Sequence, residues 1–172
     1  EIRSRGLGDV YKRQGGVNIS SVHGPMSDEL AKQLGTKASF FGACGISLVL
    51  HPRSPKIPTV HMNLRYFETL SGNCWYGGGI DLTPYFPYPE DFRHFHQTLQ
   101  QVCERCIPDS YEEYKKNCDE YFCLPHRQEM RGIGGIFFDH LNGSEEKYFN
   151  LVHEVGEAVS YTHLTLPTTS SV

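Results

Sequence analysis

Polar and hydrophobic residues alternate along two neighbouring segments of the chain, residues 40–51 and 60–69. A period of two is typical of β-strands, because successive side chains of a strand point to opposite faces. The connection between the segments, HPRSPKIPT, is rich in proline, so the pair is predicted to form an antiparallel hairpin with a long loop. One face of the second strand then carries Val60, Met62, Leu64 and Tyr66, and the other carries His61, Asn63, Arg65 and Phe67.

The remaining segments predict further strands and then helices. Apolar residues at helical spacing predict a helix that starts at Pro89, a helix capped by Ser110, and a last helix that carries Leu151. Strands that come first, followed by helices and one more strand, favour an α+β fold with a mainly antiparallel sheet. The other extended segments are expected at residues 16–24, 73–82 and 132–141.

The polar face of the predicted hairpin is unusual in composition. Cross-strand neighbours must share a face, so the pairing would bring imidazole, amide and guanidinium groups together in one row. A solvent-exposed outer face is the simpler interpretation, but such faces usually carry Thr, Lys and Glu. Interleaved Val49 and Phe67 favour instead a pocket for a flat or ring-like organic anion, in which Arg65 binds a carboxylate and His61 exchanges protons. The row consists of Ser47, His51, His61, Asn63 and Arg65.

A carboxylate is added by the third strand segment, WYGGGIDLTPYF. The period of two places Trp75, Gly77, Gly79 and Asp81 on one face, where the glycines would let a ligand approach the backbone closely. Asp81 would then accept N–H hydrogen bonds from that ligand. The alternative is a glycine-rich bulge in which Asp81 is only a turn acceptor.

Composition and charge narrow the class of protein. The 172 residues are 38% hydrophobic with a net charge of −4, which fits one globular domain and argues against a general nucleic-acid binder. No apolar run approaches the roughly 20 residues of a transmembrane helix. Six cysteines without the density of a disulfide scaffold favour a reducing compartment, and the location expected is the cytoplasm. The sequence shows neither a signal peptide nor an initiator Met, so the chain is interpreted as a fragment.

Cysteine and histidine residues offer a competing interpretation, a zinc-stabilised interaction domain. Cys106 and Cys118 fall on the apolar stripes of two predicted helices, where cysteine behaves as a small hydrophobic residue, so core packing is the favoured account. His94 and His96 are two apart on a helix and do not share a face. The zinc set would be Cys103, Cys106, Cys118, Cys123 and His126.

Three long stretches of the chain resemble the oxygen-dependent coproporphyrinogen oxidase family. They are FFGACGISLVLHPRSPKIPTVHMNLRYFET, WYGGGIDLTPYFPYPEDFRHFH and KKNCDEYFCLPHRQEMRGIGGIFFDHLN. The resemblance runs from about Gly15 to Ala158, which is interpreted as a partial oxidase domain. Residues 1–14 and 159–172 do not resemble the family and are expected to be foreign sequence or flexible tails.

The resemblance implies a flat antiparallel sheet covered by helices on both sides, in a protein that is normally a homodimer. It also implies the oxidative decarboxylation of two propionates of coproporphyrinogen III to vinyl groups, which gives protoporphyrinogen IX in haem synthesis. Oxygen is the co-substrate, and carbon dioxide and hydrogen peroxide leave. No organic cofactor is expected, because an electron-rich pyrrole can react with oxygen directly.

The family's functional positions can be carried over by motif. His61 matches the proposed proton donor, and Asp81 is suited to pyrrole N–H groups and to positive charge on a pyrrole ring. Arg131, which opens RGIGG, is a further cationic candidate without an assigned role. The substrate-binding positions implied are Ser47, Asn63, Leu64 and Arg65, and a divalent metal, as in bacterial members, would be bound by His51, His96 and His126.

The chain departs from the family after Ala158, where the family continues into further dimer contacts and a Gly-Gly-Arg substrate loop. We therefore expect an incomplete pocket, weak turnover and low stability of the chain alone. A non-catalytic tetrapyrrole-binding module is the alternative function. A mitochondrial or plastid location is the alternative to the cytoplasm if the source is eukaryotic.

Overall fold

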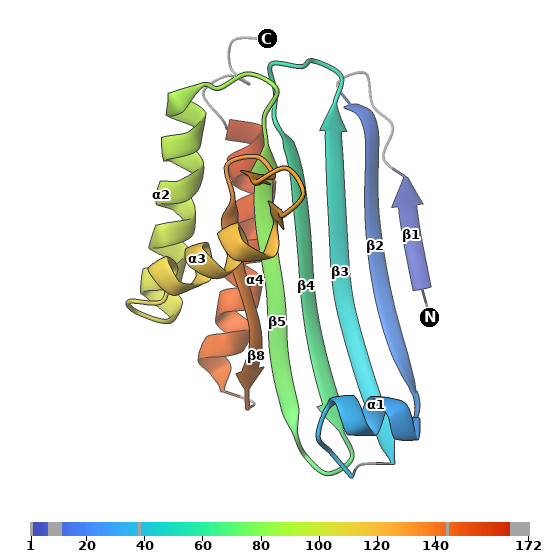
Figure 1. The fold of residues 1–172 in the computed structure, drawn as a ribbon. Coiled ribbons are helices and arrows are strands. Elements are labelled where there is room, and N and C mark those ends of the chain that lie inside the picture. Colours follow the sequence, from blue (N-terminus) through green and yellow to red (C-terminus); the bar gives the residue numbers. More distant parts are fainter. Residues whose placement is uncertain (1, 7–11, 38, 144, 166–172) are drawn as a thin grey trace.

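A computed structural model describes residues 2–6, 12–37, 39–143 and 145–165 of the chain. They form a six-stranded sheet in which every neighbouring pair of strands is antiparallel (Figure 1). A small separate hairpin is formed by β6 (Cys123–Leu124) and β7 (Glu129–Met130). The strands of the large sheet are, in spatial order, β1 (Ile2–Gly6), β2 (Lys12–Pro25), β3 (Phe40–Pro52), β4 (Thr59–Thr69), β5 (Cys74–Thr83) and β8 (Gly135–Asn142).

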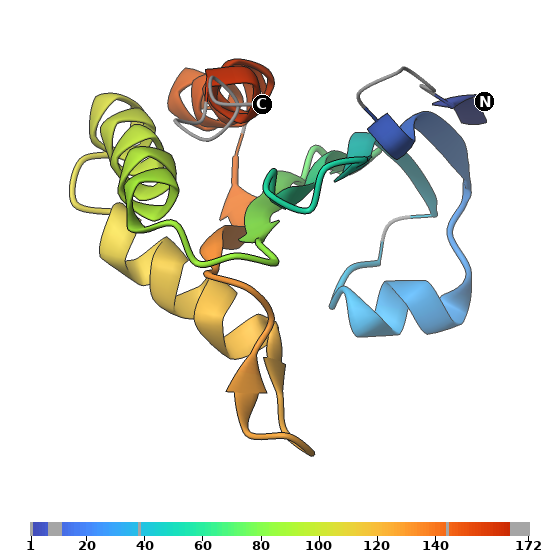
Figure 2. The same ribbon diagram turned by 90° about the horizontal axis from the view of Figure 1, so that it is seen from above.

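Helices lie on both faces of this sheet, as predicted. Viewed from above, α4 and α2 lie on one side of the sheet, whereas α3 and the β6–β7 hairpin lie on the other (Figure 2). Helix α1 lies on the same side as α3, at the lower ends of β2 and β3 in the view of Figure 1. The α+β class with a flat antiparallel sheet is therefore confirmed. The helices are α1 (Asp28–Gln33), α2 (Pro89–Cys106), α3 (Tyr111–Tyr121) and α4 (Glu146–Thr165).

The predicted strand and helix positions agree with the structure to within a few residues, with one local error. Ser110 occupies the position before α3 but makes no side-chain capping hydrogen bond. Its backbone is already helical, with φ −84° and ψ −18°, and its side chain is buried rather than turned toward the free N–H groups of the first turn. An N-cap needs an extended backbone to direct its oxygen back onto the helix, so the capping prediction is wrong.

Most of the hydrophobic core lies between the sheet and the helices α2 and α4, and Tyr111 and Tyr114 of α3 belong to the same cluster. The apolar faces predicted for the hairpin and the third strand supply Val60, Leu64 and Ile80, all nearly fully buried. Leu99 of α2 and Leu151 of α4 belong to the same cluster. Because this face of the sheet is used for the core, the opposite face of the same strands is left for polar residues. Within the described ranges, no helix is both long enough and apolar enough to cross a membrane.

Candidate functional site

Strand register places the predicted polar row on one face of the sheet. On β3 and β4, Val49 lies opposite His61, Ser47 opposite Asn63, and Gly45 opposite Arg65. On β4 and β5, His61 lies opposite Asp81, Asn63 opposite Gly79, and Arg65 opposite Gly77. Directly opposed residues share a face of an antiparallel sheet, so the side chains predicted to meet do meet.

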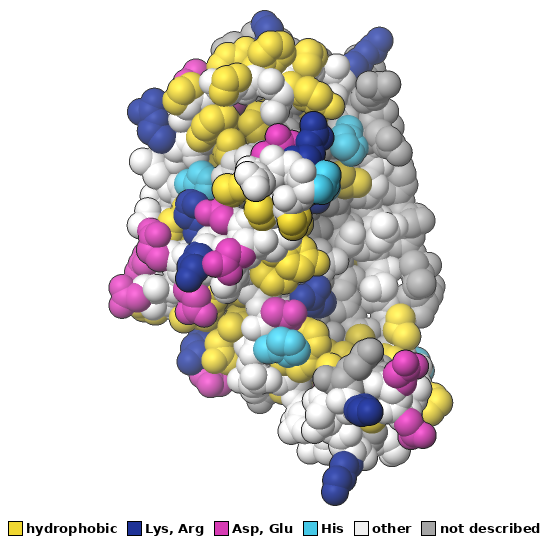
Figure 3. All heavy atoms as spheres, viewed as in Figure 1, with side chains coloured by type: hydrophobic (Ala, Val, Ile, Leu, Met, Phe, Trp, Pro, Cys, Tyr) yellow, Lys and Arg dark blue, Asp and Glu magenta, His cyan; other side chains and the backbone are white. Residues whose placement is uncertain are grey.

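These side chains line a pocket of about 400 Å³ on the face that also carries α3. Phe137 of β8, together with Tyr121 and Phe122 at the end of α3, adds an aromatic wall. Figure 3 shows charged and histidine side chains beside hydrophobic ones at the upper end of this face. The polar residues of the lining are Ser47, His61, Asn63, Arg65, Asp81 and Arg131.

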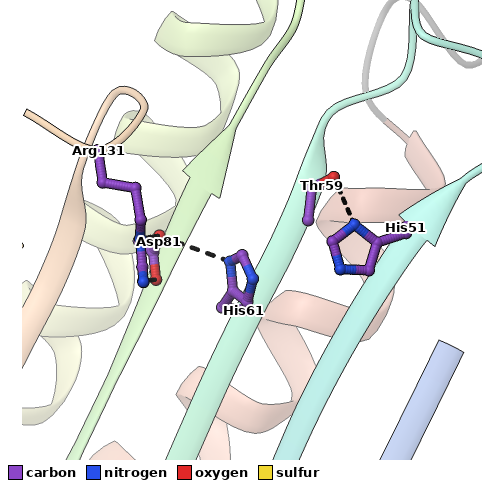
Figure 4. Close-up of polar contacts among 5 residues, drawn as sticks. All are labelled: His51, Thr59, His61, Asp81 and Arg131. Carbon is purple, nitrogen blue, oxygen red and sulfur yellow. Dashed lines mark hydrogen bonds and ion pairs between the residues drawn. The ribbon is translucent and has the colours of Figure 1, made fainter. Parts of the chain in front are cut away.

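Asp81 is the most deeply buried charged group of the pocket, with 2% of its side chain exposed. Arg131 donates to both of its oxygens: Nη2 lies 2.8 Å from Oδ1 and Nε lies 3.2 Å from Oδ2 (Figure 4). A two-point pair of this kind fixes the carboxylate in position as well as compensating its charge. The sequence had marked Arg131 as a cation without a role, and the structure gives it this partner.

The segment RGIGG presents Arg131 by lying directly on strand β5. The Ile133 N–H donates to the Leu82 carbonyl, and the Leu82 N–H donates to the Gly134 carbonyl. Gly132 has a φ of +65°, and a β-carbon there would collide with the same Leu82 carbonyl. The guanidinium of Arg131 also lies 3.9 Å from the centre of the Phe122 ring. Glycine is therefore required for the approach that brings Arg131 to Asp81.

His61 lies between the carboxylate of Asp81 on β5 and the imidazole of His51 on β3. Its Nδ1 is 3.7 Å from Asp81 Oδ2, within ion-pair range but beyond a hydrogen bond, and 32% of the side chain is exposed (Figure 4). The ring centre of His51 is 6.0 Å away, edge-on. His51 is itself tied by its Nδ1 to the hydroxyl of Thr59 at 3.3 Å. His61 is thus accessible from the pocket and supported from behind by a buried carboxylate.

The glycines of the GGG segment have different neighbours. Gly79 lines the pocket, so a ligand can approach its backbone there. Above Gly77 the space is already occupied by the side chains of Arg65 and Asp139. Arg65 donates through Nη2 to Asp139 Oδ2 at 2.8 Å. Sequence reasoning did not single out Asp139, and the predicted opening at Gly77 is filled by this ion pair.

Leu64 does not share the polar face. Its side chain is 4% exposed and belongs to the core on the opposite side of β4, where it faces Gly156 of α4. The strand period had placed the side chain there as well. Any contact between a ligand and this residue would have to involve its backbone, and that role stays a prediction.

The three histidines of the predicted metal set are not brought together. In the described part of the chain, no group of three or more His, Cys, Asp and Glu side chains is placed to hold a metal ion. His96 Nδ1 lies 2.8 Å from the Tyr111 hydroxyl and Nε2 lies 3.0 Å from the Ile133 carbonyl, so both ring nitrogens are engaged. His126 is exposed on the turn of the β6–β7 hairpin. The residues of this chain therefore do not fit a three-histidine centre.

The proposed zinc cysteines are also better explained by packing. Cys103 and Cys118 are fully buried. Burial raises the pKa of Cys103 to about 11 and that of Cys118 to about 12, so both thiols stay protonated near neutral pH. Zinc binds thiolates, and Cys123 is exposed away from any such group among the described residues.

His96 is expected to be a structural residue. Burial lowers its pKa, which keeps the ring neutral, with Nε2–H donating to Ile133 and Nδ1 accepting from Tyr111. Replacing His96 by Ala removes both bonds, and we expect the free energy of unfolding to fall by about 2–3 kcal/mol. Urea denaturation measures this change.

His126→Ala is the matched control, because its side chain is exposed. We expect less than about 0.5 kcal/mol for it. Both variants are also unfolded with and without Mn²⁺ or Zn²⁺. A metal-dependent rise in stability that vanishes in both variants would contradict the structural role and would restore the predicted metal set.

Comparison with known proteins gives one consistent result. A family model described as coproporphyrinogen III oxidase matches residues 6–169. The oxygen-dependent coproporphyrinogen-III oxidase of Homo sapiens, named as mitochondrial, is 44% identical over 92% of this chain. The Drosophila melanogaster protein is 44% identical over 92% of the chain, and the Prochlorococcus marinus protein is 51% identical over 78%.

These matches cover only part of the relatives. The chain spans 38% of the human protein, 40% of the Prochlorococcus protein and 44% of the Drosophila protein. The family match is also wider than the resemblance between Gly15 and Ala158. The structure places residues 2–6 in β1 and continues α4 to Thr165. The division of the chain at residues 15 and 158 stays a prediction.

Proposed function

The chain belongs to the coproporphyrinogen III oxidase family, and from this premise we propose that its pocket binds coproporphyrinogen III and takes part in oxidative decarboxylation. The observation that carries the proposal is the convergence of Arg65, His61 and the Asp81–Arg131 pair on one pocket with an aromatic wall. The substrate has four carboxylates and a flexible macrocycle of pyrrole rings, for which the pocket offers a cationic side chain and an aromatic wall.

The proposed reaction converts each of two propionates to a vinyl group. The carbon–carbon bond to the carboxylate breaks and releases CO₂, and its electron pair forms the double bond. The carbon next to the pyrrole loses a hydride equivalent to O₂, which also takes up one proton and leaves as H₂O₂. Oxygen accepts both electrons, so the reaction as written requires no organic cofactor.

His61 is the proposed source of the proton that reduced oxygen takes up. It is the titratable group of the pocket that is both partly exposed and close to a buried carboxylate. An imidazole is suited to proton exchange near neutral pH, and the Asp81 carboxylate lies 3.7 Å from its Nδ1. Asp81 itself has only 2% of its side chain exposed, so the geometry favours an electrostatic role through His61 over direct contact with pyrrole N–H groups.

Arg65 is the proposed anchor for a substrate carboxylate. Its side chain is 37% exposed, lines the pocket, and uses one nitrogen on Asp139, so other donors remain for a ligand. Asn63 and Ser47 lie beside it on the same face and can add hydrogen bonds. A homodimer and the cytoplasmic location, with mitochondrion or plastid as alternatives, stay predictions; several relatives are named as mitochondrial.

Titration of the purified chain with coproporphyrin III, the stable oxidised form of the macrocycle, tests the proposal by fluorescence. We expect saturable binding that is lost with the tetramethyl ester, and a loss of about tenfold in affinity for Arg65→Ala. Arg105→Ala, which removes an exposed ion pair with Glu154 and does not line the pocket, is the control and should leave the affinity unchanged. Failure of the tetraacid to bind, or equal binding of the ester, would refute the proposed pocket.

A further inference from the structure

A second acidic residue, Asp139 of β8, lies beside the pocket and pairs with the proposed carboxylate anchor Arg65, with 29% of its side chain exposed. Figure 3 shows a further group of basic, acidic and histidine side chains lower on the face of the sheet. Asp139 Oδ2 accepts from Arg65 Nη2 at 2.8 Å, and Asp139 Oδ1 accepts from the backbone N–H of His140 at 2.9 Å. One oxygen of the carboxylate thus binds the guanidinium, and the other binds the main chain of its own strand.

The backbone is shaped to make this arrangement. Strand β8 has an irregularity opposite β5: Phe138 pairs with Gly78 and Leu141 pairs with Tyr76, so Asp139 and His140 together face the single residue Gly77. His140 has a φ of +52°, a conformation that costs energy for a residue other than glycine. Bulges beside functional sites redirect side chains, and this one turns the His140 N–H onto Asp139.

The side chain of Arg65 is supported from below as well. A β-carbon at residue 77 would overlap Asp139 Oδ1 and would lie 2.8 Å from Arg65 Nε, so only glycine admits the pair. The guanidinium also lies 5.9 Å from the centre of the Trp75 ring, and His140 contacts the same ring at 4.9 Å between centres. Asp139, Trp75 and the space left by Gly77 therefore determine where the guanidinium of Arg65 lies.

The two Arg–Asp pairs of the pocket differ in a way that indicates different roles. Arg131 uses two nitrogens on Asp81, so one edge of its guanidinium is committed to holding that carboxylate. Arg65 uses one nitrogen on Asp139, while the other Asp139 oxygen is taken by His140. A single-point pair holds a guanidinium in place without occupying the edge with which it binds a ligand.

We propose that Asp139 is a positioning residue that orients Arg65 for a substrate carboxylate, with Gly77 and the left-handed His140 making room for it. This inference rests on the proposed function of Arg65 as the anchor. It predicts a change in binding affinity opposite to the change that charge alone predicts. Asp139 places a negative charge beside a pocket for an anion, so charge alone predicts that its removal tightens binding. Positioning predicts the opposite, because a free arginine must be ordered when the ligand binds.

A double-mutant cycle with coproporphyrin III as probe tests the proposal. We expect Asp139→Ala to weaken binding by about five- to tenfold, and to cause no further loss when added to Arg65→Ala. Asp139→Asn keeps an acceptor oxygen and should bind more tightly than Asp139→Ala. Gly77→Ala should reproduce the loss, whereas Gly16→Ala, with open space around its β-carbon position, should not. Unchanged or tighter binding by Asp139→Ala, or losses that add in the double variant, would overturn the inference.

A ligand-free measurement separates this inference from the proposed function. The Nε–H resonance of Arg65 in ¹⁵N NMR spectra should report slow guanidinium rotation in the unmodified chain and faster rotation in Asp139→Ala. If the unmodified chain does not bind the porphyrin, the function of the pocket is refuted. If the rotation of Arg65 is the same with and without Asp139, the positioning role is refuted whatever the pocket binds.

Discussion

Arg131→Ala is expected to lower the free energy of unfolding by about 3 kcal/mol or more, because it leaves a buried carboxylate without its cation. Asp81 has 2% of its side chain exposed and receives both of its short hydrogen bonds from Arg131. His61 at 3.7 Å is too far to replace them. Urea denaturation followed by circular dichroism measures the change, with the slope against denaturant concentration expected to stay constant.

Two further variants separate loss of the ion pair from loss of packing. Arg127→Ala removes an exposed ion pair with Glu129 and should change stability by less than about 0.5 kcal/mol. Asp81→Asn in the Arg131→Ala background removes the uncompensated charge, so the double variant should be more stable than Arg131→Ala alone. If the double variant is no more stable, the loss comes from the Phe122 contact of Arg131 and not from the carboxylate.

The residues of the hairpin could be placed from the sequence because a strand has only two faces. Once His61 and Arg65 are known to share a face, core burial of Leu64 fixes which face it is. The observed pairing of Ser47 with Asn63 then follows from antiparallel register. The glycines and Asp81 could be added for the same reason, since β5 follows β4 through a short turn and must lie beside it.

The partners of these residues could not be placed, because they depend on contacts between distant segments. Asp139 is 74 residues from Arg65, and Arg131 is 50 residues from Asp81, with two helices between them in the chain. No local pattern reports the register of β8 against β5, least of all across an irregularity. RGIGG did carry a signal, since three glycines in five residues indicate a close backbone approach, but nothing in the sequence says to which strand.

Helix periodicity alone could not show whether His96 meets the other histidines of the predicted metal set. The spacing of His94 and His96 shows that they do not share a face. The two partners of His96, Tyr111 on α3 and the Ile133 carbonyl beside Arg131, come from other elements. His96 therefore links α2 to the segment that presents Arg131, a connection that becomes visible only in three dimensions.

Asp81→Asn is expected to reduce oxidative decarboxylation by at least about 100-fold while leaving the affinity for coproporphyrin III within about threefold. The carboxylate is almost inaccessible, so it contributes little to binding, but its charge would stabilise the positive charge that develops on the pyrrole during the reaction. Single-turnover assays with the chain in excess of coproporphyrinogen III, read by the fluorescence of protoporphyrin after oxidation, measure the rate.

The pattern of losses distinguishes an enzyme from a binding module. Glu154→Gln, on α4 and paired with Arg105, is a matched loss of one carboxylate charge outside the pocket and should leave both rate and affinity unchanged. If Asp81→Asn keeps more than a tenth of the rate, the charge of Asp81 is not part of the chemistry. If the unmodified chain binds the porphyrin but forms no vinyl product above a protein-free control, this segment is a tetrapyrrole-binding surface whose catalysis needs parts of the family's fold that lie outside it. Product formed at a rate that depends on Asp81 would instead place the decarboxylation chemistry on the face shared by β4 and β5.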